Sequence, residues 1–434
     1  MALPSADKFV STREFAQSLD GKDPLHHFRE QFFLPVDKIY LDGNSLGLMP
    51  RKSEIAIQRV LNEWKSMGIG GWLNAQIPWF YFSERMGEKI APIVGAKPSE
   101  VVMTGTTTIN LHSLVSTFYQ PEGAKTKILA DELNFPNDLY ALGGQIQMKG
   151  LNLQNHLVLV PSEDGKTLDE QKIIEMMTPD IALIILPSVL YRSGQLLNIA
   201  HLTKEAHARN IVIGFDCCHS VGAVPHKFDE WDVDFAFWCS YKYLNSGPGA
   251  PGFLYINERH FSKKNGLIGW FGYIKEKQFD MALQFEQANN AGGWQISSPG
   301  IIAAGGVEGA LEITLAAGIE QIRKKSLHMT EYLIFLVKEL LSQEPYSFLI
   351  GTPLEPTRRS GHIALEREKD AYRINKALIH HGFIPDFRPP NVIRIAPIAL
   401  YNTYEEVWNL VQTLKQIIDT KEYLQFSEER SIIS

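Results

Sequence analysis

Lys242 stands where a reactive amine could meet a carboxylate and a histidine. It follows the apolar run Phe235–Trp238, and a second apolar run, Ile211–Phe215, leads directly into Asp216 and His219. Lysine amines hold aldehydes as Schiff bases, and a carboxylate beside a pyridine nitrogen keeps that ring protonated as an electron sink. The two segments therefore predict an enzyme that holds pyridoxal phosphate (PLP).

Each of these three residues also has an interpretation without catalysis. Lys242 would hold the aldehyde and then move a proton between substrate and cofactor, whereas a lysine taken alone is usually a surface residue. Asp216 would face the pyridine nitrogen, or it could only cap a following helix. His219 could brace Asp216 or the ring, or it could be a hydrogen-bonded core histidine. The paired motifs favour catalysis for Lys242 and Asp216 and leave His219 open.

Two further segments could hold the phosphate and the ring. Thr104–Thr108 leads into apolar residues at helical spacing, and hydroxyls with free amides at a helix start bind anions. Threonines are also ordinary helix caps. In Asn134–Asp138, Phe135 could stack on the ring, although the segment also has the composition of a turn.

Short apolar runs alternate with stretches of helical period, which predicts a sheet covered on both faces. The predicted strands are Lys127–Ala130, His156–Val160, Ile181–Leu186, Ile211–Phe215, Phe235–Trp238 and Phe253–Ile256. A helix over Ile199–Arg209 would make a crossover between two parallel strands. Ligands collect at the carboxyl ends of such strands, where Asp216 and Lys242 fall.

The flanks carry amphipathic helices, one after Pro50 and one over Val407–Ile418. We therefore expect three parts: residues 1–65 as an N-terminal arm and helix that contribute to a small domain, 66–304 as a large cofactor-binding domain, and 305–434 as the C-terminal small domain.

The composition narrows the class of protein. The chain has 434 residues, of which 44% are hydrophobic, so it can bury a large core. The 42 basic and 49 acidic residues show no basic cluster that would predict nucleic-acid binding. The longest aliphatic run, Ile181–Leu186, is far shorter than a membrane span, and Met1–Lys8 does not resemble a secretory signal. Three cysteines without metal spacing favour a reducing compartment, so we expect a cytoplasmic enzyme.

Ordered motifs along nearly the whole chain resemble kynureninase, a PLP-dependent family with the aspartate-aminotransferase-like fold. The motifs are Tyr40–Gly47, Asn110–His112, Phe135–Asp138, Gly214–Asp216, His219–Gly222, Val233–Ala236, Ser240–Asn245, Gly269–Gly272 and Arg394–Pro397. The resemblance implies an α/β protein of PLP fold type I. Its large domain would carry a mostly parallel seven-stranded sheet covered by helices, beside a smaller α+β C-terminal domain.

The resemblance also implies a reaction: hydrolysis of the Cβ–Cγ bond of L-kynurenine, or of its 3-hydroxy form, to L-alanine and anthranilate or 3-hydroxyanthranilate. This is a step of tryptophan catabolism by the kynurenine pathway and can feed NAD biosynthesis. Lys242, Tyr241 and Asp216 would be catalytic. The implied cofactor-binding residues are Thr107, Thr108, Phe135, Asp138, Asp216, His219, Tyr241, Lys242, Trp270 and Ser298, and the implied substrate-binding residues are Arg394, Ser45, Trp72 and Ser297.

Two of these roles have open alternatives. Arg394 would clamp the substrate carboxylate, because a guanidinium is a planar bidentate donor, or it could only form a surface ion pair. Tyr241 would exchange a proton with Cβ after the γ-carbonyl has been hydrated and the aromatic acid has left, or it could only anchor the phosphate.

The chain departs from the family pattern near the substrate ring. Trp72 stands where animal members carry histidine, Ser298 replaces an asparagine, and Pro187 takes a place often held by a small hydroxyl residue. The ring preference therefore stays open, because indole differs from imidazole in volume and hydrogen bonding.

The resemblance implies a homodimer in which Trp270 and Ser298 reach the phosphate of the neighbouring subunit. A nearer alternative is a cysteine desulfurase or aminotransferase of the same fold, but a desulfurase needs a thiol on a mobile loop, and all three cysteines lie in or beside predicted strands. A more distant alternative is a PLP-fold protein without activity, which Lys242, Asp216 and Arg394 argue against.

Overall fold

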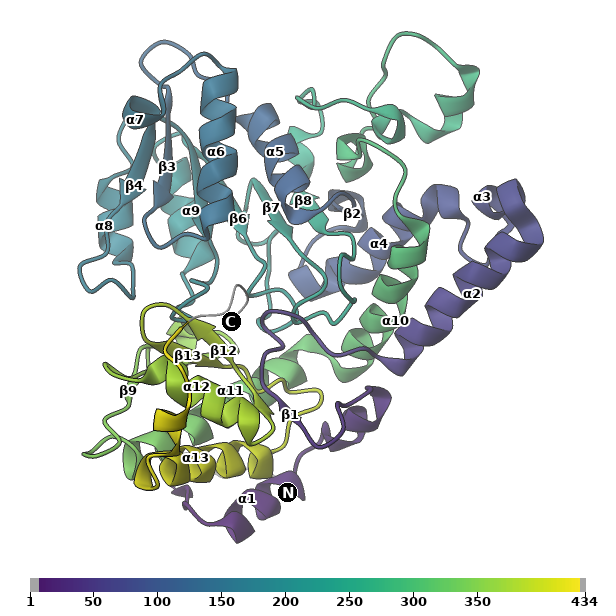
Figure 1. The fold of residues 1–434 in the computed structure, drawn as a ribbon. Coiled ribbons are helices and arrows are strands. Elements are labelled where there is room, and N and C mark those ends of the chain that lie inside the picture. Colours follow the sequence, from purple (N-terminus) through teal and green to yellow (C-terminus); the bar gives the residue numbers. More distant parts are fainter. Residues whose placement is uncertain (1–7, 430–434) are drawn as a thin grey trace.

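A seven-stranded sheet forms the centre of the larger of two units in the computed structural model, which describes residues 8–429 (Figure 1). Its strands are β2 (Val101–Met103), β3 (Lys127–Asp131), β4 (Leu157–Val160), β5 (Ile181–Pro187), β6 (Val212–Asp216), β7 (Phe235–Trp238) and β8 (Phe253–Ile256). They lie in the order β2-β8-β7-β6-β5-β3-β4. The neighbouring pairs from β4 through β7 are parallel, whereas β8 is antiparallel to both β7 and β2. The predicted mostly parallel seven-stranded sheet is confirmed.

Both faces of this sheet are buried, because alternate side chains of each strand enter different cores. Ile184 and Phe215 belong to one core, and Ile185 and Phe237 belong to the other. The helices of this unit are α3 (Gly71–Asn74), α4 (Phe82–Val94), α5 (Thr107–Phe118), α6 (Pro136–Met148), α7 (Leu153–His156), α8 (Glu170–Glu175) and α9 (Ile199–His207). Residues of α4, α8 and α9 pack in the first core and residues of α5 and α6 in the second.

All six predicted strands exist, with ends that differ by at most one residue. The sequence did not reveal β2, because three residues are too few to show a period. It also could not reveal the reversed direction of β8, since direction depends on how the chain returns to the sheet.

The smaller unit contains a four-stranded antiparallel sheet in the order β12-β13-β10-β9. Its elements are α11 (Ile319–Leu340), β9 (Leu349–Ile350), β10 (Ile363–Glu366), α12 (Ala371–His380), β11 (Phe383–Ile384), β12 (Asp386–Arg388), β13 (Val392–Ile395) and α13 (Tyr404–Asp419). From the N-terminal arm, α1 (Arg13–Asp20) packs against α13, and β1 (Ile39–Tyr40) pairs with β11. These two elements lie where an arm contributing to a small domain is expected.

Helix α2 (Arg51–Met67) lies elsewhere, along α10 (Ile301–Ala317) at the edge of the larger unit (Figure 1). A β-carbon at Gly309 would overlap with the backbone of Lys52 and Ser53, so glycine is needed for this close approach. The predicted division at residues 65 and 304 stays a prediction, although α2 packs with α10 rather than with the four-stranded sheet.

Within residues 8–429, no single helix is long and apolar enough to cross a membrane. The bent pair α10 and α11 passes on length and composition, with an angle of 77° between the two helices. The segment before Lys8, on which the expectation about a secretory signal rested, lies outside the described residues.

Candidate active site

The carboxyl ends of the central strands bring the predicted chemical groups together. Asp216 is the last residue of β6 and pairs in register with Pro187 of β5 and Phe237 of β7. Lys242 follows β7 by four residues. Because these strands are parallel and adjacent, Asp216 and Lys242 meet at one edge of the sheet, as the sequence predicts.

A cavity of about 180 Å³ lies among these strand ends. It is lined by Thr107, Thr108, Leu133, Phe135, Asn137, Asp138, Pro187, Val189, Tyr191, Asp216, Cys218, His219, Tyr241 and Lys242. All predicted cofactor-binding residues except Trp270 and Ser298 are therefore on the wall of one cavity.

His219 contacts Lys242 rather than a remote part of the core. The Lys242 Nζ lies 3.1 Å from His219 Nε2. Burial, together with the charge of Lys242, lowers the pKa of His219 well below its ordinary value, so the ring is neutral and can accept a hydrogen bond from the ammonium. Of the interpretations left open by the sequence, this geometry supports a place in the site.

Two neighbouring carboxyl groups line the same cavity as the lysine: Asp138, which is buried, and Asp216, which is half-buried. One oxygen of Asp216 accepts a hydrogen bond from the Cys218 amide at 2.8 Å. Burial and then the charge of Asp216 raise the pKa of Asp138 well above its ordinary value, because two adjacent carboxylates cannot both ionise easily. Asp138 therefore keeps its proton to a higher pH than an ordinary carboxyl group and can donate a hydrogen bond.

Thr107 and Thr108 are the first two residues of α5, and the cap position before them belongs to Thr106. The Thr106 side chain makes no capping hydrogen bond, while the Thr108 hydroxyl donates to the Asn137 side chain at 2.9 Å. The alternative that these threonines serve as helix caps is therefore not supported. The start of α5 faces the cavity with hydroxyls and free amides, which is a favourable site for an anion.

Phe135 and Tyr191 form an aromatic wall of the cavity. Their ring centroids are 5.3 Å apart and the rings are nearly perpendicular. The sequence analysis did not identify Tyr191, Asn137 or Val189. A usable signal existed for Tyr191, because it lies in the loop directly after the carboxyl end of a predicted strand.

Arg394 is buried, so the alternative of a surface ion pair is wrong. It forms an ion pair with Asp386, donates to the Tyr191 carbonyl at 2.7 Å, and donates to the Ser45 hydroxyl at 3.0 Å. It does not itself line the cavity, but the Tyr191 that it holds does. Arg394 and Ser45 therefore meet beside the cavity, although 349 positions separate them in the chain.

Tyr241 lines the same cavity, and its carbonyl accepts a hydrogen bond from the Gly47 amide at 2.8 Å. A β-carbon at Gly47 would overlap with the backbone of Lys242 and Asn245, so the close approach requires glycine. Burial raises the pKa of the Tyr241 phenol, which therefore keeps its proton. The N-terminal motif Tyr40–Gly47 thus supports the loop that carries the lysine.

Comparison with known proteins agrees with this geometry. Curated kynureninases resemble the chain over almost its full length. The protein from Geobacillus thermodenitrificans (strain NG80-2) is 54% identical over 423 residues, which is 98% of each chain. That from Shouchella clausii (strain KSM-K16) is 52% identical over 432 residues, which is 100% of each chain. A model of the kynureninase C-terminal domain matches residues 322–414.

The chain belongs to the kynureninase family.

Solved structures show that this member of the kynureninase family has PLP fold type I. The apo cysteine desulfurase of Thermococcus onnurineus NA1 superposes with a TM-score of 0.77 at 18% identity, covering 91% of this chain and 98% of that chain. A C-DES variant with glycine covalently linked to its PLP cofactor superposes with a TM-score of 0.77 at 17% identity, covering 89% and 98%.

The cavity of this kynureninase-family chain has groups that suit PLP. Asp138 Oδ2 and His219 Nδ1 are buried and have no hydrogen-bond partner among the described residues. Polar atoms of this kind are costly unless a ligand pairs with them. With the Lys242 amine, the Asp216 carboxylate and the start of α5 on the same wall, the residues present fit both the ring and the phosphate of PLP.

Besides Arg394 and Ser45, which lie beside the cavity wall, four of the predicted site residues lie outside this cavity. Trp270, Ser297 and Ser298 are exposed, and the Trp270 side chain is 45% exposed. Trp72 lines a separate apolar hollow between α2 and α10, together with Trp64, Ile69 and Ile302. Within the part of the chain that the structure describes, these four residues do not join Lys242.

Proposed function

We infer that this member of the kynureninase family is a PLP-dependent hydrolase of the Cβ–Cγ bond of L-kynurenine, 3-hydroxy-L-kynurenine or both. The products are L-alanine and anthranilate or 3-hydroxyanthranilate. The observation that carries this inference is the placement of Lys242, His219, Asp216 and Asp138 on one cavity in a chain 54% identical to a kynureninase.

When bound, PLP supplies an electron sink for the carbanion formed at the substrate Cα. The residues of the chain do the rest. Lys242 holds the cofactor and moves the Cα proton, and neutral His219 accepts a hydrogen bond from its amine. Asp216 would pair with the pyridine nitrogen. Thr107, Thr108 and the amides of α5 would hold the phosphate, and Phe135 would lie against the ring.

Tyr241 is the proposed proton donor to Cβ. Its phenol lies on the same cavity as Lys242 and keeps its proton because burial raises its pKa. A protonated phenol beside the reacting carbon can act as a general acid once the aromatic acid has left. The same phenol can also hydrogen-bond the phosphate.

Arg394 and Ser45 form the proposed site for the substrate carboxylate. The guanidinium is already aligned by Asp386 and by the Tyr191 carbonyl, so little side-chain freedom remains to be lost on binding. Ser45 lies at 3.0 Å from it and can share the same carboxylate.

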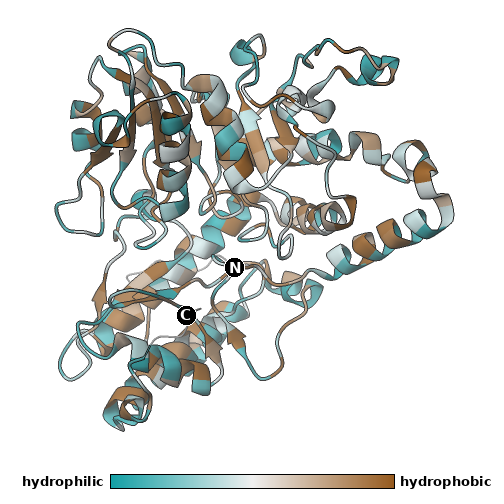
Figure 2. Ribbon diagram, turned by 45° about the horizontal axis from the view of Figure 1, so that its top comes forward, coloured by the Kyte–Doolittle hydropathy of each residue, from teal (hydrophilic) through white to brown (hydrophobic). Residues whose placement is uncertain are grey.

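We further propose a homodimer whose two active sites are shared. The edge around α2 carries many exposed apolar side chains, among them Ile55, Trp64, Ile69, Leu73, Phe279 and Leu283. Hydrophobic bands recur along α2 at this edge (Figure 2). An exposed apolar surface of this extent is typical of a protein interface. In the dimer, Trp270 and Ser298 of one subunit reach the phosphate of the other, and Trp72 and Ser297 reach its substrate.

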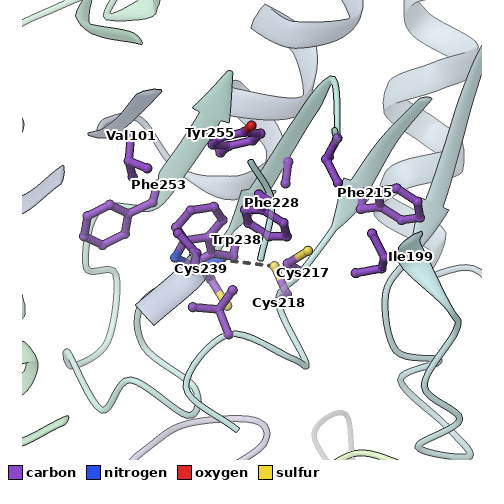
Figure 3. Close-up of a cluster of buried hydrophobic side chains, with 14 of the residues drawn as sticks. Val101, Ile199, Phe215, Cys217, Cys218, Phe228, Trp238, Cys239, Phe253 and Tyr255 are labelled. Atoms are coloured by element: carbon purple, nitrogen blue, oxygen red, sulfur yellow. Dashed lines mark hydrogen bonds between the residues drawn. The ribbon is translucent and has the colours of Figure 1, made fainter. Parts of the chain in front are cut away.

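The alternative of a cysteine desulfurase is not favoured, because no described cysteine lies on an open loop. Cys217, Cys218 and Cys239 are free and buried among Phe228, Trp238 and neighbouring apolar side chains (Figure 3). Burial raises the pKa of Cys217 to about 12 and the pKa of Cys218 well above its ordinary value, so these two thiols are poor nucleophiles. Three reduced thiols also support the proposed cytoplasmic location.

The direct test is incubation of the purified protein with L-kynurenine and with 3-hydroxy-L-kynurenine. We expect alanine and the matching aromatic acid in equal amounts. Trp72→His is expected to shift the ratio of kcat/KM between the two substrates by about 10-fold or more, because it exchanges indole for imidazole at the aromatic end of the substrate pocket. If both compounds were inert while another aryl ketone released alanine, the named substrate would be wrong.

A further inference from the structure

A chain of hydrogen bonds runs from His226 to the backbone of Asp216. His226 Nε2 lies 2.9 Å from the Ser220 hydroxyl, and that hydroxyl lies 2.7 Å from the Ser188 hydroxyl. The Ser188 hydroxyl donates to the Asp216 carbonyl at 2.9 Å. The amide of Ser188 donates to the same carbonyl at 2.8 Å. The side chains of His226, Ser220 and Ser188 therefore form a chain that leads to the backbone of Asp216, the residue proposed to face the pyridine nitrogen.

The direction at the Asp216 end follows from the carbonyl. A carbonyl can only accept, so the Ser188 hydroxyl donates to Asp216 in this contact. The Ser220 hydroxyl can donate to the Ser188 oxygen at 2.7 Å, and the Ser220 oxygen can accept from His226 Nε2 at 2.9 Å in the tautomer that carries the ring proton on Nε2. In that tautomer each proton of the chain is used once.

The whole chain is shielded from water. Ser188 and Ser220 are fully buried, and His226 is 4% exposed. Burial lowers the pKa of His226 to about 4, so the ring is neutral at physiological pH. Hydrogen bonds in such surroundings have no competing water, and an unpaired partner left behind is costly.

The chain holds both ends of the turn that carries the chemical groups. Ser188 holds Asp216 at the start of the turn. Ser220 closes its end, because its amide donates to the Cys217 carbonyl at 3.1 Å. His219 precedes Ser220, and its own carbonyl accepts from the Ser360 hydroxyl at 2.8 Å. The position of the turn is therefore set from the side opposite the cavity.

We propose that His226, Ser220 and Ser188 are positioning residues that hold Asp216 in place against the PLP ring through this hydrogen-bond chain. None of the three touches the proposed substrate position, and none lines the cavity. The inference rests on the proposed function, because it assumes that PLP occupies the cavity. Loss of one link loosens the turn, so the carboxylate pairs less well with the pyridine nitrogen.

The test measures PLP binding rather than turnover. We expect Ser188→Ala, Ser220→Ala and His226→Leu each to raise the Kd for PLP about 5-fold, which is the effect of one net hydrogen bond. The pH midpoint of the bound-cofactor absorbance is also expected to move by about half a unit, because it senses the charge at the pyridine nitrogen. The double variant Ser188→Ala/His226→Leu should fall short of the sum of the two single effects, since both break one chain.

Thr330→Val is the matched control. Thr330 is fully buried and donates a hydrogen bond to the Ser326 carbonyl at 2.9 Å, but it lies in α11 within the smaller unit. This control should lower the melting temperature without changing the Kd or the absorbance midpoint. Chain variants with an unchanged Kd and midpoint would overturn the proposal even if they melted earlier. Wild-type protein that bound no PLP would overturn the proposed function as well.

Discussion

Two regions of the molecule differ in whether one chain supplies a complete site. One is the group of residues Lys242, His219, Asp216 and Asp138 on the cavity wall, which we call the cavity floor. The other is the exposed apolar edge around α2. On the floor, Lys242, His219, Asp216 and Asp138 contact one another or line one cavity, and their buried polar atoms are aligned in advance. At the edge, Trp72 and Trp270 lie apart from that cavity, and Trp270 is largely exposed.

A residue with a predicted role in the site of this molecule therefore need not be buried within its own subunit. Floor residues are held by the sheet, so their geometry does not depend on a partner. Residues at the edge lie on helices and loops. The exposed apolar side chains around them are typical of a surface that a partner covers. A second copy of the chain would supply both the cover and a cavity for these residues to reach.

The largest expected effect comes from removing the amine of Lys242, which lines the cavity. Lys242→Ala removes both the attachment point and the proton carrier, so turnover should fall by roughly 10²–10⁴-fold from the loss of proton transfer alone. Borohydride should fix PLP to the wild-type protein but not to this variant, as read by mass spectrometry. Lys338→Ala, on an exposed part of α11, should behave like the wild type. Wild-type rates in Lys242→Ala would remove the basis of the proposed mechanism.

A smaller effect is expected from changing Arg394, which lies on β13 of the smaller unit, beside the cavity. Arg394→Lys keeps the charge but loses the planar fork, so KM should rise about 10- to 100-fold while kcat changes less. Arg388→Lys is the control, because Arg388 pairs with the same Asp386 at 2.9 Å. Equal effects in the two variants would point to the shared ion pair and against a carboxylate clamp.

Subunit mixing tests the edge directly. Trp270→Ala should weaken PLP binding about 10-fold if the indole reaches the cofactor of the neighbouring subunit. At a PLP concentration that saturates the wild type but leaves Trp270→Ala largely without cofactor, a mixture reassociated with Lys242→Ala should recover about a quarter of wild-type activity, since half of the dimers are mixed and each has one intact site. No recovery from chains shown to exchange would mean that Trp270 does not act across an interface.

The smallest expected effect compares a carboxyl group buried at the end of a sheet strand, Asp131, with one on the surface, Asp164. Burial raises the pKa of Asp131, at the end of β3, to about 7. Between pH 4 and 7 the folded protein therefore holds a proton that the unfolded chain has released, and stability falls as pH rises, by at most about 1.4 kcal/mol per unit. Urea unfolding of Asp131→Asn should show a weaker decline over this range.

Asp164 provides the opposite sign as a control. Its slight burial is outweighed by hydrogen bonds from the amides of Thr167 and Lys166, which lower the pKa of Asp164 to about 2. Its contribution is present above pH 4 and lost as pH falls towards 2. Asp164→Asn should therefore lower stability by a constant amount above pH 4, with the difference from wild type shrinking as pH falls towards 2, and leave the decline between pH 4 and 7 as it is in the wild type.

Much of the fold was accessible from the sequence because buried strands have a local signature. The run Phe235–Trp238 is a strand at the predicted residues, and Asp216 ends its neighbour as expected. The short β2 and the reversal of β8 were not accessible, since neither changes the local composition. Tyr191 was missed because an aromatic residue in a loop has many ordinary explanations.

The sequence alone placed an amine, a carboxyl group and a histidine after buried strands, and the family resemblance added the second carboxyl group, Asp138. The contact between His219 and Lys242, the raised pKa of Asp138 beside Asp216, and the contact between Ser45 and Arg394 became visible only in the folded structure. The physical reason is that strand formation depends on neighbouring residues, whereas hydrogen bonds and pKa values depend on groups brought together by packing from distant parts of the chain.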